Sequence, residues 1–262
     1  RYTLNNDSVY YFPYIEQRAS RELSHTKYAF ASLLYHELAH ANDYFPKTIW
    51  NNISLNERAV DFSFNRIVNE SIMSSELTRQ LQLVGSEMRS LAQVRFQGAD
   101  ATSTQKALST DDVASLFQVE AAPQFYSYSS TREDYAILFD GLMMRARYNV
   151  MRDVAVRDQE YDNVEWGQRG REGEEQIKPR LKFTLEAILP EFSEANGFID
   201  DLPAPIALPT GVHWRDTREL PETAPKHAKQ HSFAEHLLRV SDKPNVRLMP
   251  IENRRYKEIE LN

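Results

Sequence analysis

Two histidines four residues apart, His36 and His40, constrain the fold of this chain more than any other feature of its sequence. Residues i and i+4 lie on one face of an α-helix, whereas in a strand they would stand about 13 Å apart. On a helix both imidazoles can reach one metal ion, at about 2.0–2.1 Å each. Glu37 lies beside this face, where its carboxylate can take a proton from a metal-bound water instead of binding the ion. The spacing therefore predicts a helix that bears a metal site.

The residues around the two histidines favour such a helix over residues 24–43, ended by Pro46. Apolar residues recur within it at helical spacing, which is typical of a helix that packs one face against a core. We expect these apolar residues to form its buried stripe. They are Phe30, Leu34, Leu38 and Ala41.

The chain has no cysteine, so any transition metal must be held by His, Asp or Glu side chains, with water at the remaining positions. A catalytic zinc takes three protein ligands and keeps a fourth position open. Two downstream carboxylates compete for the third place. They are Glu133, at the start of a helix expected over residues 131–153, and Glu57, at the start of a helix expected from Ser54.

The surroundings of the two carboxylates differ. Ala136 lies one turn after Glu133, and its small side chain would let this helix approach the histidine helix closely. Asp140 lies a further turn on, where it could orient a ligand histidine, and Asp61 would have that place beside Glu57. Each Glu follows a Ser by three residues, as in a capping box.

We favour Glu133 as the third ligand because a second pair of residues with the same spacing, Thr131 and Asp134, can serve as the capping box of its helix. Asp43, three residues after His40, either hydrogen-bonds a ligand imidazole or lies in water near the helix end.

The segment from His36 to Asp43 (HELAHAND) resembles the gluzincin type of zinc metallopeptidase, in particular the catalytic domain of anthrax lethal factor and related bacterial peptidases. In that group the ligand Glu lies in an ExxA pattern, which Glu133 to Ala136 matches. The resemblance also implies a tyrosine upstream of that Glu that stabilises the oxyanion, with Tyr126 and Tyr128 as its equivalents here. Residues 56–61 are instead similar to the NExxSD pattern of thermolysin-like enzymes, except that Val60 replaces a small residue.

Only 8 glycines and many long periodic segments predict a mainly α protein, or α+β with a small sheet. Further helices are expected over residues 54–94, with a break at 74–75, and over 111–120 and 178–196. A strand is expected over residues 9–14, and loops over 99–109 and 158–175. We divide the chain into a zincin-like catalytic core, residues 1–200, and an extended, proline-rich C-terminal arm, residues 201–262, packed on it. In the arm a helix is expected over residues 232–240 and a strand over 246–249.

The charge balance of 31 basic against 38 acidic residues, a net charge of -7, argues against a nucleic-acid partner. No apolar run approaches the ~20 residues that span a bilayer, so we expect no transmembrane segment. The start at Arg1 and the absence of cysteine lead us to expect a bacterial protein of the cell envelope or a secreted one.

These features predict a zinc-dependent hydrolase, a metalloendopeptidase that acts on peptide or protein substrates with Zn²⁺ held by His36, His40 and a downstream Glu. One alternative is a non-catalytic protein that binds metal or peptide on a zincin fold. Glu37 argues against it, because metal binding alone does not require this carboxylate. Another alternative is a metal-dependent hydrolase of a non-peptide amide.

Overall fold

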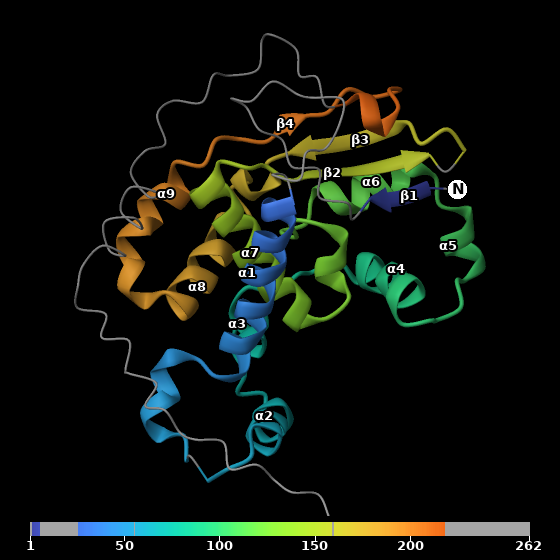
Figure 1. Cartoon of the computed structure of the whole chain (residues 1–262). Coiled ribbons are helices and arrows are strands. Elements are labelled where there is room, and N and C mark those ends of the chain that lie inside the picture. Colours follow the sequence, from blue (N-terminus) through green and yellow to red (C-terminus); the bar gives the residue numbers. More distant parts are fainter. Residues whose placement is uncertain (1, 6–25, 55, 159, 218–262) are drawn as a thin grey trace, which may run out of the picture.

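Helix α1 (Thr26–Tyr44) packs along helix α7 (Thr131–Tyr148), and this pair forms the centre of the structure (Figure 1). The computed structural model describes residues 2–5, 26–54, 56–158 and 160–217. Helices α3 and α8 pack against both α1 and α7. The mainly α class predicted from the sequence is confirmed.

The remaining helices are short. The α-helices are α2 (Ala59–Val68), α3 (Met73–Gln80), α4 (Ser86–Phe96), α5 (Ser103–Ala107), α6 (Thr110–Gln118), α8 (Lys178–Ile188) and α9 (Asn196–Asp200). The 3-10 helices are η2 (Lys47–Asn52), η3 (Phe125–Tyr128), η4 (Arg171–Gly173), η5 (Pro190–Ala195) and η6 (Trp214–Asp216). None of the helices in the described part of the chain is both long and apolar enough to cross a bilayer.

A small antiparallel sheet lies along one side of the helices (Figure 1). Its strands follow the order β1 (Tyr2–Asn5), β2 (Asp153–Asp158), β3 (Val164–Arg169) and β4 (Ile206–Ala207). Because β2 follows α7 directly in the chain, the sheet adjoins the C-terminal end of α7, beside the N-terminal part of the antiparallel α1. The described part of the expected C-terminal arm joins the same sheet through β4, and Leu208 and Trp214 are buried beside it.

Two large hydrophobic clusters and a smaller one beside the sheet fill the interior of the described residues. One lies between α7 and α8 and includes Ala39 of α1, Leu142 of α7 and Leu181 of α8, all completely buried. The other packs α4 and α6 under the sheet and includes Met88, Phe117 and Val156, also completely buried. Helix α7 contributes an unbroken run of buried residues from Asp134 to Ala146, which identifies it as the central helix of the fold.

Buried arginines tie the helices to the sheet and to each other. Arg169 of β3 forms a bidentate pair with Asp153, its cross-strand partner in β2, at 2.6 Å for both hydrogen bonds. Arg171 donates to the main-chain carbonyls of Phe117, Gln118, Glu120 and Ala122 around the end of α6. These guanidinium groups satisfy carbonyl and carboxylate oxygens that would otherwise be buried without a partner.

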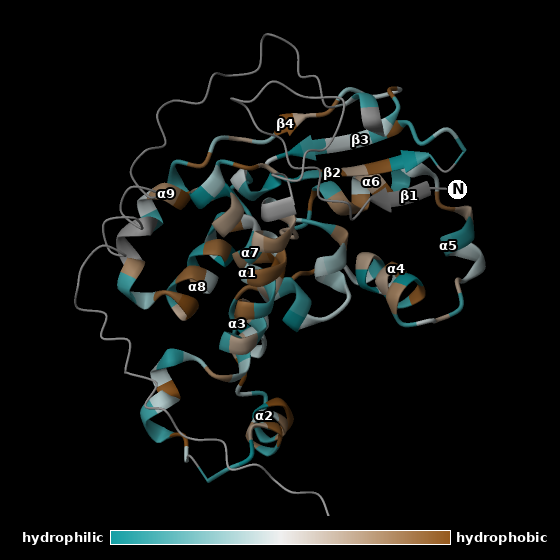
Figure 2. Ribbon diagram, viewed as in Figure 1, coloured by the Kyte–Doolittle hydropathy of each residue, from teal (hydrophilic) through white to brown (hydrophobic). Residues whose placement is uncertain are grey.

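The predicted buried stripe on α1 was wrong. Phe30, Leu34 and Leu38 are 69%, 57% and 49% exposed, and Ala41 is exposed as well. The face that packs against α7 bears small and polar residues instead: Ser32 and Asp43 are buried and Ala39 is completely buried. Small side chains on this face let the two helix backbones approach closely, which large apolar residues would prevent. Figure 2 shows hydrophobic residues along α1 and α2. Several of their side chains are exposed, including Leu33 of α1 and Phe64 of α2.

Segment boundaries also differ from the sequence prediction. The helix expected from Ser54 begins at Ala59, with Arg58 as N-cap, and breaks occur at residues 69–72 and 81–85 instead of 74–75. Within the expected loop at 99–109, a capping box between Thr102 and Gln105 starts α5.

The segment 158–175, expected as a loop because of its charges and glycines, contains β3. Gly167 in this strand allows neighbouring residues to approach its backbone closely. A Cβ atom there would lie 2.8 Å from the side chain of Leu208 and 3.1 Å from the carbonyl oxygen of Val154. The expected strand at 9–14, helix at 232–240 and strand at 246–249 lie outside the described residues.

Candidate metal centre

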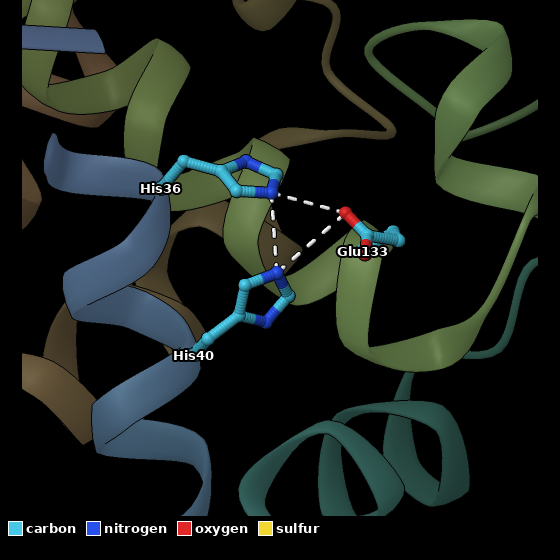
Figure 3. Close-up of side chains that lie close together, drawn as sticks. All are labelled: His36, His40 and Glu133. Atoms are coloured by element: carbon cyan, nitrogen blue, oxygen red, sulfur yellow. Dashed lines mark hydrogen bonds and ion pairs between the residues drawn. The ribbon is translucent and has the colours of Figure 1, made fainter. Parts of the chain in front are cut away.

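Helix α1 brings His36 and His40 together as their spacing predicts. Their Nε2 atoms lie 3.1 Å apart and their rings meet edge to face, with centroids 4.7 Å apart (Figure 3). Their side chains are 18% and 20% exposed, so the pair lies near the surface and remains open to solvent on one side.

Glu133 of α7 completes a group of three. Its Oε2 atom lies 3.0 Å from His36 Nε2 and 3.6 Å from His40 Nε2, although 97 residues separate it from His36 (Figure 3). The three potential ligand atoms all lie within 4.8 Å of one another. The structure thus brings together the three residues that the sequence favoured as ligands.

The start of α7 leaves the Glu133 carboxylate available for this position. Ser130 is the N-cap, and its hydroxyl accepts a 3.2 Å hydrogen bond from the main-chain N–H of Glu133. In a complete capping box the Glu side chain would turn back to the N-cap, but here it points toward α1. Ala39 and Ala136 are both completely buried between the two helices, and their small side chains permit the close approach that the sequence predicted for α7.

The spacing of the three ligand atoms matches one tetrahedral ion. Ligands at about 2.0–2.1 Å from a tetrahedral centre lie roughly 3.3–3.4 Å from one another. The observed separations of 3.0, 3.1 and 3.6 Å lie on both sides of that value. Two imidazole nitrogens and one carboxylate oxygen, on side chains that are 18–23% exposed, form a donor set that suits a catalytic zinc site.

The electrostatics of the group also suit a cation. Hydrogen bonds with His36 and His40 lower the pKa of Glu133 to about 2, although partial burial opposes this shift. The hydrogen bond with Glu133 in turn raises the pKa of His40, and the carboxylates of Glu133, Glu37 and Asp43 add to this effect. The carboxylates of Glu133, Glu37 and Asp43 thus favour positive charge at His40, as they would favour a bound cation.

Glu37 and Tyr126 lie around the same centre. Glu37 is exposed on α1, and its carboxylate contributes to the raised pKa of both His40 and Tyr126. Tyr126 belongs to η3, just before α7, and is half-buried against Phe96, with ring centroids 5.1 Å apart. Burial raises the pKa of Tyr126, and the nearby Glu133 and Glu37 raise it further, so its hydroxyl stays protonated as a hydrogen-bond donor.

Tyr128, the other tyrosine considered for this role, lies elsewhere. It is 4% exposed, and its hydroxyl donates a 3.0 Å hydrogen bond to Glu120 in the cluster beneath the sheet. Burial and this carboxylate raise the pKa of Tyr128 strongly. The Tyr128 hydroxyl is therefore bonded in the core, and of the two tyrosines Tyr126 is the one whose hydroxyl is influenced by Glu133 and Glu37.

Both predictions for Asp43 were wrong. Asp43 is completely buried, so it does not lie in water, and its Oδ1 atom accepts a 2.6 Å hydrogen bond from the main-chain N–H of Ser74. Its Oδ2 atom has no hydrogen-bond partner among the described residues, so neither oxygen bonds an imidazole. Asp43 therefore accepts a hydrogen bond from the first turn of α3, whose N-cap residue Ile72 provides no side-chain hydrogen bond. The charge of Asp43 contributes to the raised pKa of His40.

Asp140 does not orient a histidine either. Its Oδ1 atom accepts a 2.7 Å hydrogen bond from Ser32 Oγ, and its Oδ2 atom pairs with the buried Arg152. Ser32 lies one turn before His36 on α1. Asp140 therefore positions the histidine helix as a whole, by joining it to α7 and to the start of the sheet.

Glu57 lies outside the group of three ligand atoms. It is exposed and precedes α2, and Asp61 in the first turn of α2 forms an exposed ion pair with Arg58 at 3.5 Å. The thermolysin-like spacing therefore has no counterpart in the geometry of this centre.

Sequence reasoning missed two hydrogen bonds that tie α1 to α7 beside the ligands. Arg132 Nη1 donates to Tyr44 Oη at 2.6 Å, and Tyr135 Oη donates to Asn42 Oδ1 at 2.9 Å. Arg132 precedes the ligand Glu133, and Tyr44 follows His40 by one turn. The closeness of Arg132 and Tyr44 to the ligand residues in the sequence was the one indication of their pairing. It can be used only when the packing of α1 against α7 is known.

Comparison with models of protein families, with curated protein sequences and with solved structures gave no match.

Proposed function

We propose that this chain is a zinc-dependent hydrolase of the gluzincin type that cleaves peptide bonds as a metalloendopeptidase. The observation that carries the proposal is the mutual spacing of His36 Nε2, His40 Nε2 and Glu133 Oε2, which matches the edges of one tetrahedron around an ion. The resemblance of residues 36–43 and 133–136 to that group of peptidases supports it independently.

The roles of the residues follow from their positions. Zn²⁺ bound by His36, His40 and Glu133 would lower the pKa of a coordinated water and polarise the substrate carbonyl. Glu37, exposed beside His36, accepts the proton of the attacking water and later delivers it to the leaving amine. Tyr126, protonated and close to both carboxylates, donates a hydrogen bond to the developing oxyanion.

A peptide fits this centre better than a small amide does. The ligand side chains are 18%, 20% and 23% exposed, and Glu37 is exposed, so the centre lies at an accessible surface instead of in a narrow closed pocket. The side chains of Phe30, Leu33 and Leu34 are exposed on α1 on the N-terminal side of Glu37. They offer apolar contacts to the side chains of an extended substrate.

Elemental analysis tests the metal centre. Purified wild type reconstituted with zinc should hold about one zinc per chain, and Glu133→Ala should lose it. Glu57→Ala is the matched control and should keep it, because Glu57 lies outside the group of ligand atoms. Wild type that binds no zinc, or loss of zinc only in Glu57→Ala, would refute the centre as described.

Hydrolysis of an unfolded protein substrate such as casein tests the chemistry. Glu37→Gln should keep zinc and lose peptidase activity, because the amide cannot accept the proton. Full activity in this variant would exclude the proposed base. Zinc-loaded wild type that cleaves no peptide would favour the alternative of a metal- or peptide-binding protein without catalytic activity.

A further inference from the structure

A hydrogen-bonded pair lies directly beside the metal ligands. Arg132 is the residue before Glu133 at the start of α7, and Tyr44 follows His40 by one turn on α1. Arg132 Nη1 donates a 2.6 Å hydrogen bond to Tyr44 Oη, and both side chains are half-buried. This pair therefore joins α1 to α7 beside the ligand residues His40 and Glu133.

The charge of Arg132 is not paired at short range. No carboxylate oxygen of the described residues lies within 4.0 Å of its guanidinium group, whereas Arg152 and Arg180 each pair with a buried aspartate. The charge of Arg132 acts on Asp43, but that carboxylate is completely buried and bonded to the main chain of Ser74. A half-buried guanidinium held by one neutral hydroxyl retains donors in a planar fork that matches a carboxylate.

We propose that Arg132, held in place by Tyr44, binds a carboxylate group of the substrate. This inference rests on the proposed function, since it concerns the same centre. The carboxylate belongs either to an acidic side chain or to the C-terminus of the peptide, because both present the same planar acceptor.

The distance between the bound carboxylate and the scissile bond follows from helix geometry. Tyr44 and His40 are an i, i+4 pair, whose Cβ atoms lie about 5–6 Å apart. An extended peptide advances about 3.3 Å per residue, so the bound carboxylate belongs one to three residues from the cleaved bond. Arg132 would therefore determine which bond of a peptide is placed at the zinc.

Four hydroxamate probes test the inference without requiring turnover. Each is a succinyl hydroxamate joined to a dipeptide whose first residue is leucine. The second residue is alanine with a free C-terminal carboxylate, alanine amide, glutamate amide or glutamine amide. The hydroxamate binds zinc in all four, so each pair differs only in one carboxylate. Affinities are measured by calorimetric titration into the zinc-loaded protein.

We expect one of the two pairs to show about tenfold or more tighter binding of the carboxylate member, as a charge-assisted hydrogen bond provides. The alanine pair identifies a C-terminal carboxylate, and the glutamate–glutamine pair identifies an acidic side chain. In Arg132→Gln the preference should fall below about twofold, and Arg132→Lys should retain only part of it.

Tyr44→Phe removes the hydrogen bond to Arg132 and should reduce the same preference. Arg147→Gln, an exposed arginine at the other end of α7, is the matched control and should keep it. Circular dichroism and zinc content establish that each variant is folded and loaded. If the hydrogen bond between Arg132 and Tyr44 only held α1 against α7, the Arg132 variants would lower the affinity for all four probes equally.

Two results would overturn the inference, and they are distinguishable. Equal affinity within both pairs for wild type would overturn carboxylate binding while leaving the zinc centre intact. Failure of all four probes to bind would overturn the zinc centre and the inference together.

Discussion

Ser130 Oγ accepts a hydrogen bond from the main-chain N–H of Glu133, while the carboxylate of Glu133 reaches across to His36 Nε2 at 3.0 Å. The same residue thus begins a helix with its main chain and completes the candidate metal centre with its side chain. The position of the third ligand therefore depends on the cap of α7 as well as on the packing of α7 against α1.

Loss of this cap should weaken both stability and zinc binding. Ser130→Ala removes the acceptor for the N–H of Glu133 and should lower the free energy of unfolding by about 1 kcal/mol, as measured by urea denaturation. Zinc affinity should fall with it, because the first turn of α7 frays around the ligand.

Ser109→Ala is the control for the cap of α7. Ser109 caps α6 through the N–H of Asp112, away from the ligands, so its loss should cost similar stability without any change in zinc affinity. Equal zinc affinity in Ser130→Ala and wild type would show that the cap does not position Glu133.

Zinc should stabilise the folded chain. A ligand present at 100 times its Kd adds about 2.7 kcal/mol to the free energy of unfolding, which should raise the Tm of a chain of this size by roughly 5–10 °C. Differential scanning calorimetry with zinc, and with a chelator in its place, measures the shift. Glu133→Ala should show little of it, and a full shift in that variant would place the metal elsewhere.

The close approach of α1 and α7 should not tolerate a larger residue at Ala136. Ala136→Leu inserts extra atoms where the side chain is completely buried and should destabilise the fold by about 1–3 kcal/mol. It should also move Glu133 away from the histidines and so reduce zinc content. Ala41→Leu enlarges an exposed alanine on α1 and should leave both quantities unchanged. Unchanged zinc content in Ala136→Leu would argue against tight packing as the cause of the geometry.

Loss of the buried ion pair between Asp134 and Arg180 should lower the free energy of unfolding more than loss of an exposed ion pair. Arg180 bonds Asp134 with both terminal nitrogens and also donates to the carbonyls of Leu81 and Ala121. Asp134→Ala leaves the buried guanidinium charge unpaired and should cost about 3–5 kcal/mol.

The exposed pair of Lys47 and Glu191 provides the comparison for Asp134 and Arg180. Glu191→Ala should change the free energy of unfolding by less than about 1 kcal/mol, because solvent screens an exposed ion pair. Similar losses for Asp134→Ala and Glu191→Ala in chemical denaturation would contradict this ranking.

Several features of the fold were predictable from local sequence. The i, i+4 histidines and Pro46 predicted the extent of α1 within a few residues, and the helix expected from Thr131 begins there as α7. The expected capping box between Thr131 and Asp134 was wrong, because Ser130 is the N-cap and accepts from the N–H of Glu133. The scarcity of glycine predicted the mainly α class. These predictions succeed because helix periodicity, capping and termination depend on residues only a few positions apart.

The buried face of α1 was not predictable in this way. Phe30, Leu34 and Leu38 have the spacing of a core stripe and yet are exposed, because α7 packs against the face that bears Ala39 and Ser32. Nothing in the periodicity of one helix shows that its partner requires small residues for a close approach. Strand β3 was missed for the same reason. Its Gly167 is required by the close approach of Val154 and Leu208, which lie on other segments of the chain.

The sequence by itself determined that His36, Glu37 and His40 share one region of a helix, since this depends only on the pitch of the α-helix. Only the tertiary structure showed that Glu133, and not Glu57, lies beside the two histidines. It also showed that the Tyr128 hydroxyl bonds Glu120 in the core, and that the hydrogen bonds of Asp43 and Asp140 go to residues other than the histidines. Each of those choices depends on which helices pack together and on which of their faces. That arrangement is set by the sum of many long-range contacts, which no short stretch of residues specifies.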